Sequence, residues 1–123
     1  MTAQTTGLTL ELFSAFGNSA PVTTEQFDKA AMAIFKALSD KTRYQIVRML
    51  LRADEVSCGE VSEAFPLSSP ALSHHFRVLE HCGLMESRKE GLHMFFRLNR
   101  AQLERFFPDF ERVHGSMSLE VSG

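Results

Sequence analysis

The sequence predicts a mainly α-helical fold with one small β-hairpin, folded as a single domain over residues 1–123. Three observations support this prediction. Apolar side chains recur every three or four residues in several segments, and residues typical of helix caps precede these segments. Two of the segments are separated by only Pro66-Leu67-Ser68, which is the length of a helix-turn-helix connection. Two short apolar segments then flank Glu90-Gly91, which is typical of a β-hairpin.

Length and composition favour one hydrophobic core. The 123 residues are 44% hydrophobic, which suffices for one domain and is too little chain for two substantial ones. No apolar run approaches the roughly 18 residues of a membrane span, and the N-terminus lacks the basic-then-apolar order of a secretory signal. We therefore expect a cytoplasmic protein with no membrane partner.

The distribution of charge is more informative than its sum. The net charge of −2 argues by itself against general affinity for nucleic acid. Residues 67–100, however, carry five Lys or Arg against three Glu, together with four of the five histidines. Residues 1–30 and 101–123 together carry three basic and seven acidic side chains. This asymmetry indicates a middle segment that faces DNA, between solvated ends.

The N-terminal part predicts an arm followed by a helix. Residues 1–22 form a flexible or helical arm, whose apolar segment packs either on a partner subunit or back onto its own domain. Thr23 with Gln26 resembles a capping box, and apolar residues at helical spacing follow, so a helix is expected from 24 to 38.

Two further helices complete the helical region 24–66. Ser39 or Asp40 caps a helix that runs from Lys41 to about residue 52, with its arginines on the polar side. Ser57-x-x-Glu60 is a second capping box, and it opens a short helix that Pro66 ends.

The segment 67–83 has the pattern of a recognition helix. Ser68 is a good N-cap, Pro70 lies in the first turn, and Gly83 offers a stop. At about 100° per residue, one narrow face is apolar and the opposite face is polar without acidic residues at its centre. The apolar face consists of Leu72, Phe76 and Leu79, and the polar face of Pro70, Ser73, His74, Arg77 and His81.

The C-terminal part predicts a wing and a dimerisation helix. Residues 84–98 form a hairpin with basic residues near its tip, which is a wing when it follows a helix-turn-helix. Residues 100–114 form a helix that Pro108 breaks or restarts, and residues 115–123 a tail. Three phenylalanines on so short a segment predict a homodimer interface shared with helix 24–38: Phe106, Phe107 and Phe110.

Three motifs in order resemble the ArsR/SmtB transcriptional regulators: Lys36–Tyr44, Leu67–Leu79, and Glu86–Gly91 with Phe95–Leu98. The resemblance covers about residues 30–105. It implies a dimeric winged helix-turn-helix repressor that binds an inverted-repeat operator on double-stranded DNA and is released by an inducer.

The chain departs from this family at the usual metal sites. Arsenic and cadmium sensors of the family carry Glu-Leu-Cys-Val-Cys where this chain has Glu55 to Gly59, so Ser57 and Gly59 stand at the two thiol positions. The positions of the zinc ligands on the last helix align with residues that are not credible ligands. These residues are Arg100, Gln102, Val113 and Ser116. We therefore expect no metal site and no cofactor, and the inducer stays unidentified.

The predicted DNA contacts come from the recognition helix and the wing. Relatives often carry Gln and Arg where this chain has Ser69 and His74, which implies a different operator sequence. The expected contacts are Ser68, Ser69, Pro70, Ser73, His74, Arg77, Arg88, Lys89 and His93. The alternative is that this polar face is only solvated and contacts no DNA. Three features favour DNA contact instead: the capped preceding helix, the short turn and the basic hairpin.

Cys58 and Cys82 are candidates for thiol or redox sensing. They are too few for a disulfide scaffold and lack Cys-x-x-Cys spacing. Cys58 lies in the first turn of a capped helix, a location that favours thiol reactivity, although a small half-buried residue would suit the same position. An intramolecular disulfide is not expected, because the two residues lie at far ends of crossing helices.

Two other function classes are alternatives to a DNA-binding regulator. The first alternative is a winged helix that binds another protein, or a ligand-binding dimer with little affinity for DNA. The acidic net charge mildly favours this alternative. Enzymatic activity has almost no support, because the sequence has no Gly-rich phosphate loop and no nucleophile paired with a base.

Overall fold

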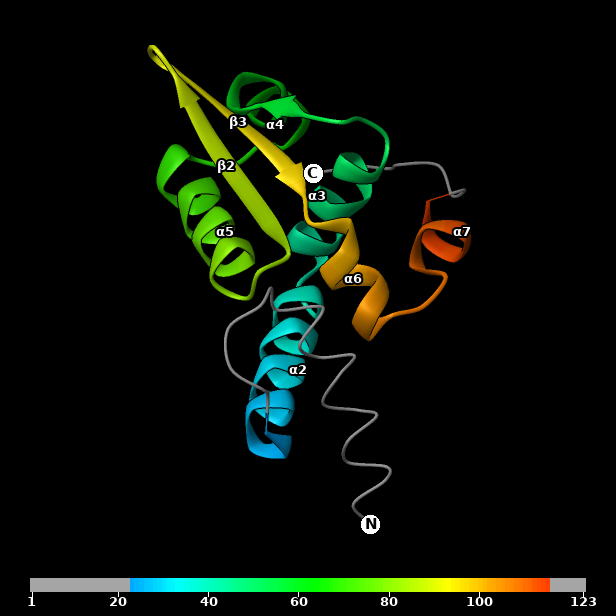
Figure 1. Cartoon of the computed structure of the whole chain (residues 1–123). Coiled ribbons are helices and arrows are strands. Elements are labelled where there is room, and N and C mark those ends of the chain that lie inside the picture. The colour runs from blue at the N-terminus through cyan, green and yellow to red at the C-terminus, as the bar shows by residue number, and fades with distance from the viewer. Residues whose placement is uncertain (1–22, 116–123) are drawn as a thin grey trace.

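The computed structural model describes residues 23–115, and the predicted N-terminal arm and nearly all of the predicted tail lie outside this range. Figure 1 shows a group of helices from which one hairpin projects, as the sequence predicts. The elements in chain order are α2 (Thr24–Leu38), α3 (Lys41–Leu51), β1 (Val56–Ser57), α4 (Cys58–Ala64), α5 (Ser69–His81), β2 (Met85–Glu90), β3 (His93–Leu98), α6 (Arg100–Phe106) and α7 (Phe110–His114).

The predicted helix caps are present. The Thr23 side chain accepts a hydrogen bond from the Gln26 amide, and the Gln26 side chain accepts one from the Thr23 amide. Of the two candidates for the cap of α3, it is Asp40 whose carboxylate accepts the Arg43 amide at 3.0 Å. Each cap satisfies backbone donors that the first helical turn cannot satisfy internally, and this fixes where α2 and α3 begin.

The hydrophobic core lies where α2, α3, α4 and α5 meet the base of the hairpin. Its fully buried side chains come from every one of these elements and include Ile34, Ile46, Leu50, Val61, Leu79 and Leu84. Arg48 differs from the prediction that the arginines of α3 lie on its polar side. It is only 8% exposed, and its Nε donates to the carbonyl of His114 at 3.1 Å. The C-terminal segment thus covers a position that the periodicity of α3 alone assigns to solvent.

The sheet contains one strand that the sequence analysis does not predict. The strand order is β1-β3-β2, all antiparallel, with Val56 opposite Phe96. β1 is two residues long, so no alternation of polar and apolar residues can reveal it. It exists because it completes the ladder of β3, and it fixes the start of α4 against the wing.

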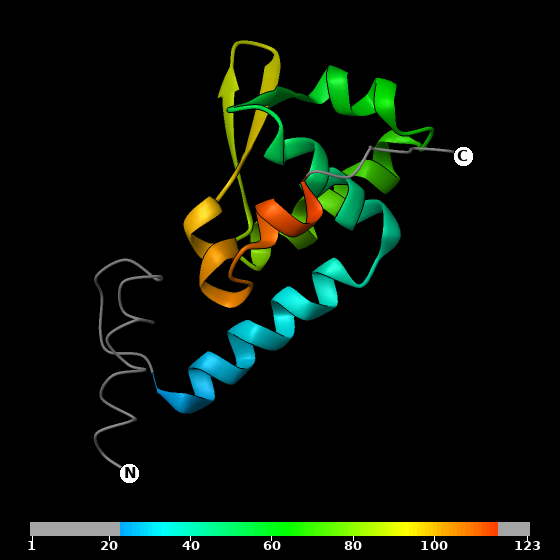
Figure 2. The same ribbon diagram turned by 90° about the vertical axis from the view of Figure 1, so that its right-hand side faces the viewer.

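The end of α6 packs against α2 within the same chain. Figure 2 shows α2 crossing beneath α6 and α7. Phe106 stacks on Phe27 with ring centroids 5.3 Å apart, and Phe107 meets Phe35 edge to face at 5.4 Å. Phe110 is only 4% exposed. The expectation that Phe110 lies in an interface is therefore wrong, because this ring belongs to the core of its own chain.

Candidate nucleic-acid interface

The recognition helix α5 begins and ends where its sequence predicts. Ser68 Oγ accepts the Ala71 amide at 3.3 Å, and Pro70 lies in the first turn, where its missing N–H has no helical partner to lose. After the C-cap residue Cys82, Gly83 adopts φ +85°, a left-handed conformation that turns the chain into β2. α5 is thus a helix of 13 residues with a side-chain cap at its start and a glycine turn after its end.

The apolar stripe of α5 fixes which face of the helix is free. Leu72, Phe76 and Leu79 are all buried, and Phe76 packs on Phe96 of β3 with ring centroids 4.3 Å apart. The opposite face is exposed along its length, and its residues are Ser69, Pro70, Ser73, His74, Arg77 and His81. The structure therefore brings the predicted helix contacts together on one exposed surface.

His75 lies on the flank of this surface and contacts its own chain. Its side chain is 14% exposed, and its Nδ1 lies 3.8 Å from a carboxylate oxygen of Asp40. Nδ1 also accepts a hydrogen bond from Arg43 Nη1 at 3.1 Å. Burial lowers the pKa of His75; the Asp40 carboxylate opposes this shift in part, and the positive charge of Arg43 adds to it. His75 therefore joins α5 to the start of α3 and is not part of the exposed face. His74, next to it, is exposed and points outward.

Arg88 of the wing is held by carboxylates of its own chain. Its Nε and Nη2 donate to the two oxygens of Glu55 at 2.7 and 2.8 Å, and its Nη1 donates to Glu90 at 3.0 Å. The guanidinium also lies over the Phe95 ring, 4.5 Å from its centroid. The hydrogen bonds from Arg88 lower the pKa of Glu55, and those carboxylates raise the pKa of Arg88. Arg88 thus joins the wing to the loop before β1.

The register of the hairpin puts the three predicted wing residues on two faces. Lys89 pairs with Met94, in line with Ser87 and Phe96, so it shares the face that packs on α5. Arg88 pairs with Phe95 and His93 pairs with Glu90, on the opposite face. Of the three, Lys89 and His93 are exposed and are not held by an ion pair in the described part of the chain.

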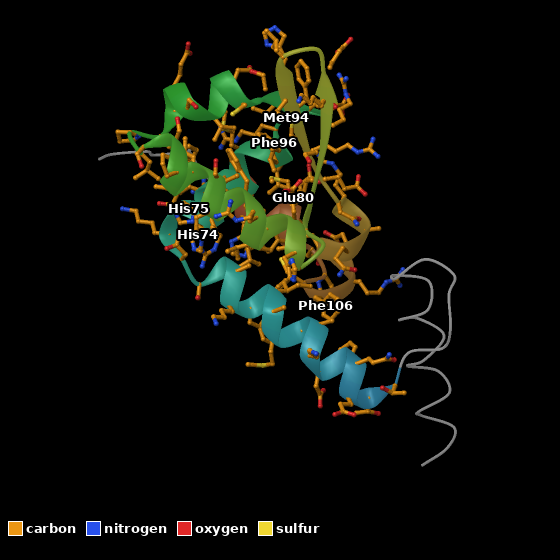
Figure 3. All side chains as sticks on the ribbon, turned by 90° about the vertical axis from the view of Figure 1, so that its left-hand side faces the viewer. His74, His75, Glu80, Met94, Phe96 and Phe106 are labelled. Atoms are coloured by element: carbon orange, nitrogen blue, oxygen red, sulfur yellow. The ribbon has the colours of Figure 1, made fainter. Side chains whose placement is uncertain are left out.

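One contact and one exposed side chain near α5 and the wing lie outside the predicted contact residues. Ser87 Oγ donates to the Glu80 carboxylate and thereby ties β2 to α5; Figure 3 shows Glu80 on α5 beside the hairpin. Leu92 lies in the two-residue loop at the tip, next to Gly91 with φ +63°, and is 95% exposed. Leu92 is not among the residues that the sequence predicts to contact DNA.

Neither cysteine forms a disulfide, and both are half-buried. Burial raises the pKa of the Cys82 thiol, whose Sγ donates to the Leu79 carbonyl at 3.4 Å. Cys82 is therefore a poorer candidate for a reactive thiol than Cys58. Within residues 23–115, no group of three or more His, Cys, Asp or Glu side chains could hold a metal ion. No helix in that range is long and apolar enough to span a membrane.

Comparison with known proteins places this geometry in a family. A family model described as a helix-turn-helix domain matches residues 38–88. The transcriptional activator HlyU of Vibrio cholerae is 33% identical over 98 residues, which cover 77% of this chain and 90% of that protein. An arsenical resistance operon repressor of Staphylococcus aureus is 32% identical over 88 residues, 72% of this chain and 84% of the repressor.

A solved structure shares the fold. An ArsR-like transcriptional regulator from Rhodococcus sp. RHA1 matches with a TM-score of 0.60 and 33% identity, over 71% of this chain and 81% of the other. Three observations point to the same family: the exposed face of α5, the hairpin beside it, and relatives matched over most of their length. The chain belongs to the ArsR family of winged helix-turn-helix transcriptional regulators, which are DNA-binding proteins and not enzymes.

Proposed function

We propose that this protein is a homodimeric repressor that binds an inverted-repeat operator and releases it when an inducer binds. The observation that carries the proposal is the exposed face of α5, which is polar, without an acidic residue at its centre, and backed by three buried apolar side chains. On this face Ser69, Ser73 and His74 would lie near base edges, and Arg77 on a base or a phosphate. Such a protein is expected to act in the cytoplasm.

The remaining predicted contacts lie at the start of α5 and on the wing. Ser68 and Pro70 at the start of α5 bring its first turn toward the DNA backbone, where an N-terminal helix turn can meet phosphates. Lys89 and His93 would contact phosphates or the neighbouring minor groove. Arg88 would reach DNA only by leaving Glu55 and Glu90.

The homodimer is supported by the exposed apolar side of α2. Met32 is 63% exposed and Phe35 46% exposed, although Phe35 also touches Phe107 in its own chain. To bind two half-sites one turn of duplex apart, a dimer with two-fold symmetry has to hold its two copies of α5 about 34 Å apart.

We expect the inducer to bind outside the metal sites that are usual in this family. Ser57 and Gly59 replace the two thiols of the arsenic and cadmium sensors, and Ser57 is occupied as the cap of α4. A thiol oxidant or a small molecule fits the residues better than a metal ion. Cys58→Ser and Cys82→Ser variants, tested for release from DNA by peroxide, distinguish these two inducer classes. Release that is unchanged in both variants would exclude the thiols.

Salt dependence tests the DNA-binding proposal. Operator sequences are selected from random duplexes, and affinity is measured by fluorescence anisotropy at increasing salt. A dimer that contacts six to ten phosphates should lose about 10³-fold or more in affinity between about 50 and 200 mM salt. The alternative, a protein-interaction or ligand-binding dimer with little DNA affinity, is favoured by the net charge of −2. No selected sequence and a weak salt response would support that alternative instead.

A further inference from the structure

A groove with basic walls runs between α2 and α5, beside the face proposed to contact DNA. Its volume is about 600 Å³. Its described lining comes from both helices and from the start of α3: Ala33, Lys36, Arg43, His74, Arg77, Val78, His81 and Cys82. Five of these eight side chains are Lys, Arg or His, and none is Asp or Glu. A concave surface with one sign of charge attracts counter-ions more strongly than a convex one.

No carboxylate of the described chain forms an ion pair with the lysine or the arginines of the groove. Arg43 is held by uncharged groups, because its Nε donates to the Ala37 carbonyl at 2.8 Å and its Nη1 to His75. The nearby Asp40 carboxylate accepts the Arg43 backbone amide as the cap of α3. Within residues 23–115, neither Lys36 nor Arg77 forms an ion pair. The wing differs, since its arginines are paired with Glu55, Glu86 and Glu90.

The size of the groove and its apolar wall restrict the ligand. Pockets for small organic molecules are about 300–1,000 Å³, and this groove falls in that range. Ala33, Val78 and Cys82 supply an apolar surface between the basic groups. A bare inorganic anion would leave this surface uncovered, whereas an organic anion with an apolar body would contact both kinds of wall.

We propose that this groove binds a small organic anion, with its carboxylate or phosphate group among Lys36, Arg43 and Arg77 and its apolar body against Ala33 and Val78. The regulatory part rests on the function proposed above: Arg77 belongs both to the groove and to the DNA-facing side of α5. An anion held at Arg77 competes with DNA phosphates for the same charge, so its binding lowers the affinity for the operator.

Binding is tested first without DNA. The full ¹⁵N-labelled protein is titrated with benzoate, phenyl phosphate, inorganic phosphate and the uncharged analogue benzamide, and backbone amide shifts are followed. Benzoate or phenyl phosphate should shift the amides of Ala33, Lys36 and Val78, while benzamide should not. The Lys36→Met variant should bind about tenfold more weakly, because it loses one charged hydrogen bond while the hydrocarbon wall stays. The control Lys29→Met changes the same residue type on α2 outside the groove and should bind like wild type.

Coupling to DNA is tested second, by anisotropy with the selected duplex at constant ionic strength. The bound probe should weaken DNA binding by wild type and by Lys29→Met, and much less by Lys36→Met. Absence of localised shifts with every probe would overturn the inference, and normal DNA binding in the same preparation would leave the proposed function standing. Probe binding by a protein that binds no duplex would support the groove and overturn the function. If Lys36→Met weakens DNA binding and no probe binds, the groove holds a DNA phosphate, and the inference is overturned.

Discussion

At the scale of single residues, the adjacent His74 and His75 have different surroundings and different expected roles. Adjacent helical residues point about 100° apart. His74 is exposed on the polar face of α5, whereas His75 is 14% exposed and accepts a hydrogen bond from Arg43. The first residue is available to DNA, and the second joins α5 to the start of α3.

Loss of His74 should weaken operator binding far more than loss of His81. Both side chains are exposed on α5, but His74 lies in its middle and His81 at its C-terminal end, away from the expected base contacts. We expect His74→Ala to cost about 1–3 kcal/mol of operator binding, and His81→Ala to cost little. Anisotropy titrations of both variants at one salt concentration measure the difference. Equal losses would count against the placement of α5 on DNA.

Protonation of His75 should destabilise the fold. Because burial lowers its pKa below the ordinary value of 6.5, the folded state favours the neutral ring. The unfolded chain then binds more protons in the window between the lowered pKa and 6.5, so stability rises with pH there. The contribution is fully present above pH 6.5 and is lost as the pH falls through the folded-state value. Melting temperatures of wild type and His75→Gln between neutral pH and about pH 5 test this. The exposed His81→Gln is the control, and parallel pH profiles of wild type and His75→Gln would contradict the expectation.

Among the elements, the wing is joined to the rest of the chain by Arg88, and Lys89 is its proposed contact with DNA. Arg88 is bound to Glu55 and Glu90, and Lys89 is exposed. We expect Lys89→Ala to lower the slope of log affinity against log salt by about one, since one phosphate contact is lost. Arg88→Ala should leave that slope unchanged and instead reduce hydrogen-exchange protection of the β2 and β3 amides. A slope reduced equally by Arg88→Ala would mean that Arg88 leaves its carboxylates to bind a phosphate.

The turn from α5 into β2 requires glycine at position 83. Gly83 has φ +85°, and a Cβ added there would lie 3.2 Å from Gln102 Nε2. We expect Gly83→Ala to lower the free energy of unfolding by about 1–2 kcal/mol for the backbone alone, and by more if Gln102 cannot move. Gly91→Ala is the matched control, because Gly91 also has a positive φ, +63°, but would meet no atom within 4 Å. Urea denaturation measures both, and equal losses would show that Gln102 yields freely.

At the scale of the whole molecule, the exposed apolar side of α2 should decide assembly. Met32 is 63% exposed in the single chain, so Met32→Glu should bury a charge only if a second chain covers it. We expect this variant to sediment as a monomer and to bind the selected duplex at least about tenfold more weakly, since one chain reaches only one half-site. Ser62→Glu on α4, which Figure 1 shows at the opposite end of the molecule from α2, is the control for the sedimentation measurement. A dimeric Met32→Glu protein would place the interface elsewhere.

Much of the fold follows from patterns that span only a few residues. The capping boxes at Thr23 and Ser57 begin α2 and α4 as predicted. The apolar stripe of α5 predicts its buried face, and therefore also the exposed face that forms the candidate DNA site. These patterns are readable because the capping bonds and the helical period join residues three or four apart.

The tertiary structure alone decided how distant segments complete one another. The two residues of β1 form a strand only against β3, the buried Arg48 donates to the carbonyl of His114 in the C-terminal segment, and Arg88 is held by Glu55, 33 residues away. The groove between α2 and α5 is likewise a property of packing, because its basic residues come from three helices. The sequence by itself thus determined the local elements and the face of α5 that is free, through short-range hydrogen bonds and periodicity. Which charged side chains are free to bind a ligand depended on long-range contacts, which no local pattern encodes.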